Sequence, residues 1–171
     1  RLLDHIGDGI AILVAAPERP RNRDIRHPYR FDSDFWYLSG FPEPEAALVL
    51  VGGKTPRSIL FCRDKDEERE IWDGFRHGPA AACERFGFDE AFSFTGFADA
   101  LPELIAGRET LWCAIGQESG LDAQIIAARN RVRAQSRAGK RAPAFLPDIR
   151  EFLQGERLIK DAHEIDIMRR A

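Results

Sequence analysis

The sequence predicts an α/β fold, because segments typical of strands and segments typical of helices alternate along it. Two continuous apolar runs, residues 10–16 and 46–51, have the length and composition of strands buried in a sheet. Further along, apolar residues at 121, 125, 126, 128 and 132 recur close to helical spacing. With 171 residues the chain is long enough to bury a sizeable core without disulfides or a structural metal.

The first half of the chain is expected to consist mainly of strands. Turn signals at Gly7-Asp8-Gly9 precede the first strand, and residues 17–30, rich in Pro and Arg, form a loop long enough to be functional. Residues 35–38 have strand-like side chains and precede a turn at 40–44 and the strand 46–51. A hairpin connection at 52–57 then leads into a third strand, 58–62.

Three consecutive aromatic residues, Phe35, Trp36 and Tyr37, are either a ligand-binding platform or part of the core. Neighbouring side chains on a strand point to opposite faces, so Trp36 would face one side, and Phe35 and Tyr37 the other. Three such rings cannot form one stacking surface. The sequence therefore predicts that they fill the core on both faces of the sheet.

The second half of the chain is expected to alternate helices and strands. The predicted helices are 81–86, ended by Gly87, then 99–105 and 121–134, and the predicted strands are 90–94 and 110–115. Pro147 is expected to begin a short helix that Gly155 ends, and residues 158–159 form a brief extended segment.

The last helix is predicted from Asp161, which stands three residues before Glu164 in a capping-box arrangement. Ile165 and Met168 would line one apolar face of it. Because this helix starts strongly and runs only to residue 171, we expect the sequence to be a piece of a longer protein.

Composition and charge exclude several classes of function. The chain has 28 acidic and 25 basic residues, so nothing suggests a polyanion-binding surface. No apolar stretch approaches the roughly 18–20 residues needed to cross a bilayer. No secretory signal is visible, and Cys62, Cys83 and Cys113 are widely spaced, as expected for reduced core cysteines rather than a disulfide framework or a zinc site.

The residues alone show no catalytic set. Gly53-Lys54-Thr55 resembles the end of a phosphate-binding loop, but Leu48 stands where that loop needs its first glycine. The four histidines have no metal-ligand spacing, and no GxSxG surrounds a serine. The carboxylates of residues 64–70 indicate a solvated charge run rather than an acid/base pair.

Three motifs, in this order and spacing, resemble the N-terminal domain of bacterial Xaa-Pro aminopeptidases. They are YRFDSDFWYLSGFPEPEAALVL, EIWDGFRHG and RLIKDAHEIDIMRRA, and the resemblance spans nearly the whole chain. It implies a mixed central sheet flanked by helices, the ribonuclease H-like fold of creatinase and prolidase N-terminal domains. We therefore expect residues 1–155 to be this domain, and residues 156–171 to be the junction and first helix of a C-terminal pita-bread metallopeptidase domain.

The resemblance also implies a function. The parent enzyme removes the first residue from peptides that have proline second, using two divalent metal ions, with manganese expected. Every metal ligand would lie beyond Ala171, so this chain should contain no catalytic or metal-binding residue and be inactive alone. We expect a cytoplasmic homo-oligomer, a dimer or tetramer, in which this domain contacts its own catalytic domain and neighbouring subunits, with no nucleic acid or membrane partner.

Three residues match positions that the family places near substrate. Trp72 matches a tryptophan that projects into a partner's active site, although a core anchor beneath the charge run is the alternative. Arg137 matches an arginine on the substrate's C-terminal side, where it would pair with a carboxylate or peptide carbonyl, and an ordinary solvated arginine is the alternative. Asp24, in the 17–30 loop, would meet the same cleft or be an ordinary loop residue.

Two further functions stay open at this point. Creatinase-like domains without metal ligands act as protein-binding modules, and the sequence downstream of Ala171 would distinguish that case by its metal ligands. The chain is alternatively the N-terminal domain of a prolidase or creatinase, which share the fold, but the EIWDG and DFWYLSGF motifs favour the aminopeptidase.

Overall fold

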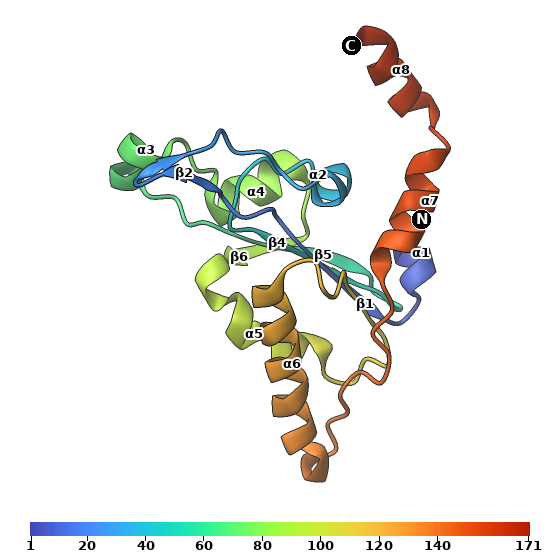
Figure 1. Ribbon diagram of the computed structural model, residues 1–171. Coiled ribbons are helices and arrows are strands. Elements are labelled where there is room, and N and C mark those ends of the chain that lie inside the picture. The colour runs from blue at the N-terminus through green and yellow to red at the C-terminus, as the bar shows by residue number, and fades with distance from the viewer.

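A five-stranded mixed sheet forms the centre of the computed structural model, which describes residues 1–171 (Figure 1). β1 (Ile10–Val14) and β5 (Arg57–Cys62) both pair antiparallel with β4 (Ala47–Val51). β6 (Glu90–Ser93) and β7 (Leu111–Trp112) join the two edges in parallel, which gives the order β6-β5-β4-β1-β7. The predicted mixed sheet is confirmed.

Helices cover both faces of this sheet. One face packs against α1 (Leu2–Ile6), α2 (Ser33–Ser39), α4 (Gly78–Phe86) and α7 (Ile149–Leu158). The other face packs against α5 (Phe97–Ile105) and α6 (Ser119–Ala134), and η1 (Phe94–Gly96) leads into α5. Successive residues of β1 alternate between the two apolar clusters, so the strand reads as a continuous apolar run.

Five further elements lie away from this core. β2 (Pro20–Asn22) and β3 (Ile25–Arg26) form a small separate ribbon, so the expected loop 17–30 has some strand structure. α3 (Glu67–Asp73) follows β5, and η2 (Ser136–Ala138) follows α6. α8 (Ala162–Arg170) ends the chain, and in Figure 1 it continues beyond α7, away from the sheet.

The expected strand at residues 35–38 is wrong, because these residues form α2. Asp32 begins the helix by accepting hydrogen bonds from the backbone N–H groups of Asp34 (3.0 Å) and Phe35 (2.8 Å). Gly40 ends it in the left-handed conformation, with φ 60° and ψ 7°. These two caps override the strand preference of the aromatic residues.

On a helix the three aromatic rings do not divide between two faces of the sheet. Phe35 is fully buried, whereas the neighbouring Trp36 is 38% exposed and stacks on Phe31 with 4.2 Å between ring centroids. Tyr37 is half-buried. The prediction that the rings do not form one platform holds, but only Phe35 fills the core.

The expectation that Gly155 ends a helix is also wrong. α7 continues through Gly155 to Leu158, because Ile149 and Leu153 are buried against the sheet and offset the roughly 1 kcal/mol that glycine costs in a helix. The expected domain boundary between residues 155 and 156 falls inside this helix and stays a prediction. The capping box of α8 is confirmed, with both Asp161–Glu164 hydrogen bonds at 2.8 Å.

The Gly52-Gly53 pair belongs to the β4–β5 hairpin, as predicted. A side chain at Gly52 would place its Cβ 1.9 Å from the backbone oxygen of Gly7, so only glycine fits there. Cys62 and Cys113 lie in the core, as expected, and burial raises the pKa of each thiol to about 12. None of the helices combines the length and the apolar character that a membrane crossing requires.

Candidate functional site

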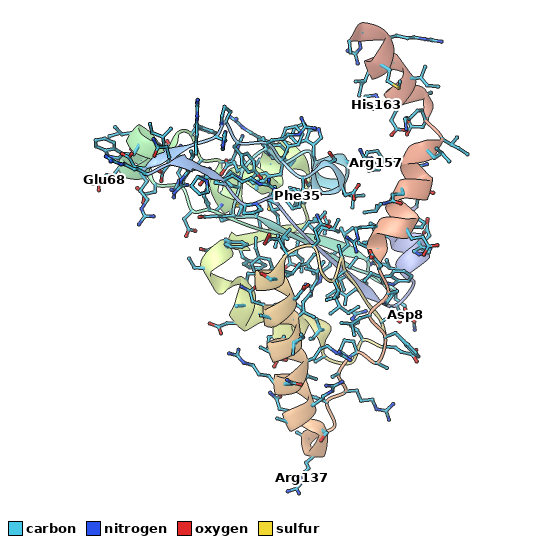
Figure 2. The ribbon with its side chains drawn as sticks, viewed as in Figure 1. Asp8, Phe35, Glu68, Arg137, Arg157 and His163 are labelled. Atoms are coloured by element: carbon cyan, nitrogen blue, oxygen red, sulfur yellow. The ribbon has the colours of Figure 1, made fainter.

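The three residues singled out from the sequence are exposed but do not form one site. Trp72 lies on α3, Asp24 in the turn between β2 and β3, and Arg137 in η2. Figure 2 shows Arg137 at the far end of α6, well away from Glu68, which marks α3. The structure does not bring Arg137 and α3 together, and the contact of any of these residues with a substrate stays a prediction.

The most unusual surface feature is an apolar group on α3 and the residues just after it. Ile71 is 78% exposed, Trp72 87% and Phe75 57%, in a segment otherwise rich in charge. We call these three residues the α3 tip. The alternative that Trp72 anchors the core is excluded by its exposure, so the indole is free to contact another molecule.

α3 forms because its ends are capped and its charges suit a helix. The Asp66 carboxylate accepts a hydrogen bond from the backbone N–H of Arg69 at 3.1 Å, and three glutamates follow in the first turn, where the helix dipole favours negative charge. Gly74, with φ 81°, ends the helix. Sequence reasoning missed α3, although an Asp before a run of Glu and a Gly after it are start and stop signals.

The tip is tied down by ion pairs on its own segment. Oε1 of Glu70 accepts hydrogen bonds from Nζ of Lys65 at 2.6 Å and from the backbone N–H of Arg76 at 2.8 Å. The hydrogen bond from Lys65, followed by the one from Arg76, lowers the pKa of the Glu70 carboxyl. Lys65 also lies over the ring of Phe75, with Nζ 4.4 Å from its centroid.

A buried polar cluster lies beneath this segment and is centred on Glu43. The side chain of Glu43 is only 6% exposed, and its Oε1 lies 2.6 Å from both the backbone nitrogen and Nδ1 of His77. Its Oε2 lies 3.2 Å from Nη2 of Arg63, whose side chain is 8% exposed. The His77 ring also packs edge-on against Phe75 (4.9 Å) and Phe86 (5.1 Å). Glu43 belongs to the GFPEPE loop, residues 40–45, which thus contacts both ends of the segment that carries α3.

The α3 tip presents apolar side chains to solvent. No group of three or more His, Cys, Asp or Glu residues lies close enough to hold a metal ion, and the resemblance places the metal pair in a C-terminal domain rather than among these residues. The site consists of an exposed indole with two apolar neighbours, on a segment whose other residues are mostly charged. Exposed apolar groups of this size are typical of surfaces that contact another molecule.

Comparisons with known proteins agree on one family. Residues 1–112 match the family model described as "Aminopeptidase P, N-terminal domain". The chain is 39% identical to the Xaa-Pro aminopeptidase of Escherichia coli (strain K12), covering 99% of this chain and 39% of that relative. It is 30% identical to Xaa-Pro aminopeptidase 3 of Homo sapiens, covering 94% and 32% respectively.

Solved structures give the same result. The aminopeptidase of Pseudomonas aeruginosa superposes with a TM-score of 0.93 at 42% identity, over 98% of this chain and 38% of that chain. The proline aminopeptidase P II of Yersinia pestis also superposes with a TM-score of 0.93, at 40% identity over 99% of this chain and 39% of that chain. The chain therefore spans less than half the length of these relatives.

Proposed function

Because the chain belongs to the aminopeptidase P, N-terminal domain family, we propose that it serves as the non-catalytic N-terminal domain of a Xaa-Pro aminopeptidase. The observation that carries this proposal is the match of 99% of this chain to 39% of the Escherichia coli enzyme. The remaining part of such a protein would hold two divalent metal ions, with manganese expected, and would cleave the bond before proline. This domain would help to wall the active site.

We further propose that Trp72 contacts the substrate residues after proline, in the active site of a neighbouring subunit. Its 87% exposure, at a position stabilised by capping and ion pairs, supports this role. A flat amphipathic ring packs well against peptide groups and apolar side chains. Residue 72 would then affect long peptides more than short ones, because short peptides do not reach it.

Arg137 has a second, separate role in this proposal, pairing with the carboxylate or a carbonyl of the peptide. Since Arg137 and α3 lie at different ends of the molecule in Figure 2, one substrate would meet both only if they came from different subunits. This geometry supports a homo-oligomer. Asp24 lies in an exposed turn, so we expect Asp24→Asn to change the kinetics little.

The proposal is tested by kinetics on the full-length enzyme with Xaa-Pro peptides of three and five residues. Trp72→Ala should lower kcat/KM for the pentapeptide about tenfold, equivalent to about 1.4 kcal/mol, and change it little for the tripeptide. Trp36→Ala is the matched control, because Trp36 is also partly exposed but stacks on a residue of its own chain. Equal kinetics of Trp72→Ala and wild type on both peptides would refute the contact.

The purified chain by itself tests the proposal that this domain is non-catalytic. With added manganese it should show no turnover of an Xaa-Pro peptide, because its residues form no metal site. Metal-dependent turnover by the pure chain would overturn the assignment as a non-catalytic domain.

A further inference from the structure

The segment that carries the α3 tip leaves the core after Arg63 and returns at His77. Arg63 directly follows β5, and His77 directly precedes α4. Both ends meet on one carboxylate, because Oε2 of Glu43 binds Arg63 (3.2 Å) and Oε1 binds His77 twice (2.6 Å each). A single buried side chain, Glu43, therefore links the two ends of the segment 63–77, which we call the excursion.

Core packing does not hold α3 in place, since none of its residues is buried. The position of the tip depends instead on contacts within and beside the segment, among them the Glu43 contacts at the two ends, the Glu70 contacts in between and the packing of Phe75 on Lys65 and His77. Contacts of this kind fix a segment only while each donor keeps its acceptor. Glu43 is the acceptor shared by both ends.

We propose that Glu43 is a positioning residue, which holds the α3 tip where Trp72 meets the peptide substrate. This inference rests on the proposed role of Trp72. Glu43 does not touch substrate itself. It acts by removing the freedom of the excursion, so that the tip is presented in one position before the substrate arrives.

The two oxygens of Glu43 have different tasks, which makes the proposal specific. A glutamine would keep one oxygen for the two donors of His77 but would turn its NH₂ group toward Arg63, placing donors against donors. Alanine would release both ends. Glu43→Gln should therefore show an intermediate effect, and Glu43→Ala the full effect.

The size of the effect follows from the population of the competent position. If the released tip occupies that position about a tenth of the time, the apparent affinity for a peptide that needs the tip falls about tenfold. A tripeptide that does not reach the tip should be unaffected. KM for the pentapeptide should rise with little change in kcat.

The test uses the full-length enzyme and two measurements on each variant, namely hydrogen–deuterium exchange of residues 66–77 and kinetics with the tripeptide and the pentapeptide. Glu43→Ala should speed exchange in this segment while leaving β1 and β4 protected, and raise the pentapeptide KM about tenfold. Glu90→Gln is the control, since it removes a surface ion pair with Arg57 (2.5 Å) and should change neither measurement. Unchanged exchange and an unchanged KM in folded Glu43→Ala would overturn the proposal.

Fast exchange throughout the sheet would reveal that Glu43→Ala unfolds the enzyme. In that case the milder variants Glu43→Gln and Glu70→Gln test the proposal. The Glu70 side chain is partly exposed and belongs to neither apolar core cluster, so its replacement should loosen the tip without disturbing the core. Faster exchange in residues 66–77 with a raised pentapeptide KM in these variants supports the proposal, and no change in either refutes it.

The same data separate the two proposals. If the Glu43 variants loosen the tip but neither they nor Trp72→Ala change the pentapeptide kinetics, the substrate contact is refuted and with it the positioning role. The structural link that Glu43 makes between the two ends of the segment would still hold. Impaired kinetics in Trp72→Ala together with normal exchange and KM in Glu43→Ala would refute the positioning role alone.

Discussion

Replacing Phe35 by alanine should be strongly destabilising, because its ring is fully buried between α2 and the sheet. Removing a buried phenylalanine ring costs about 3–5 kcal/mol. An unfolding entropy of about 2.1 cal/mol/K per residue gives about 0.36 kcal/mol/K for 171 residues. The melting temperature should therefore fall by about 8–14 °C.

The neighbouring Trp36 is the matched comparison. It is 38% exposed and stacks on Phe31, so Trp36→Ala should remove about 1 kcal/mol and lower the melting temperature by about 3 °C. Both variants should be measured by thermal and urea unfolding of the purified chain. The urea m-value should stay constant if only the folded state is affected.

The two placements of the aromatic residues predict different results. On a strand with alternating faces, both rings would be buried and the two variants would lose similar stability. On α2, only Phe35→Ala has a large effect. Equal destabilisation by the two substitutions would refute the helical placement.

Three further predictions concern α3, the start of α4 and the last helix. The pKa of Glu70 is lowered in the folded state, so its contacts stabilise α3 above the ordinary glutamate pKa of about 4.3 and are lost as pH falls through the lower folded pKa. Amide exchange of α3 should therefore become faster in that acidic range. Glu70→Gln should remove this pH dependence. Gly78→Ala should lower the free energy of unfolding in urea by about 1–3 kcal/mol, because Gly78 has φ 73° and an added Cβ would lie 3.0 Å from the Cβ of Lys65. An unchanged free energy of unfolding would contradict this close approach. Ile165 and Met168 are 39% and 63% exposed on α8, so the chain should self-associate at high concentration in sedimentation experiments. Met168→Glu should weaken this association. Sedimentation of the wild-type chain as a monomer at high concentration would contradict the expectation.

The strands at the centre of the sheet were predictable because both of their faces are buried. β1, β4 and β5 carry continuous apolar runs, and the run itself is the signal of two-sided burial. α5 and α6 show helical spacing for the corresponding reason, since only one face of each packs on the sheet. These elements could be assigned from local pattern alone.

The misassigned elements are those whose structure depends on a few specific contacts. α2 has aromatic residues that favour strands, but the Asp32 and Gly40 caps decide for a helix. α7 continues past Gly155 because burial of Ile149 and Leu153 outweighs the glycine penalty. In both places the capping and packing energies exceeded the local propensity.

The sequence by itself determined the family and the α/β class and drew attention to residue 72, since motifs and periodicity are local properties. Only the tertiary structure decided what the GFPEPE loop does. The partners of Glu43 lie 20 and 34 residues away in the chain, at Arg63 and His77, and no local pattern relates them. Hydrogen bonds between distant segments form only where folding brings donor and acceptor within about 3 Å, so the closure beneath the α3 tip is a property of the folded chain.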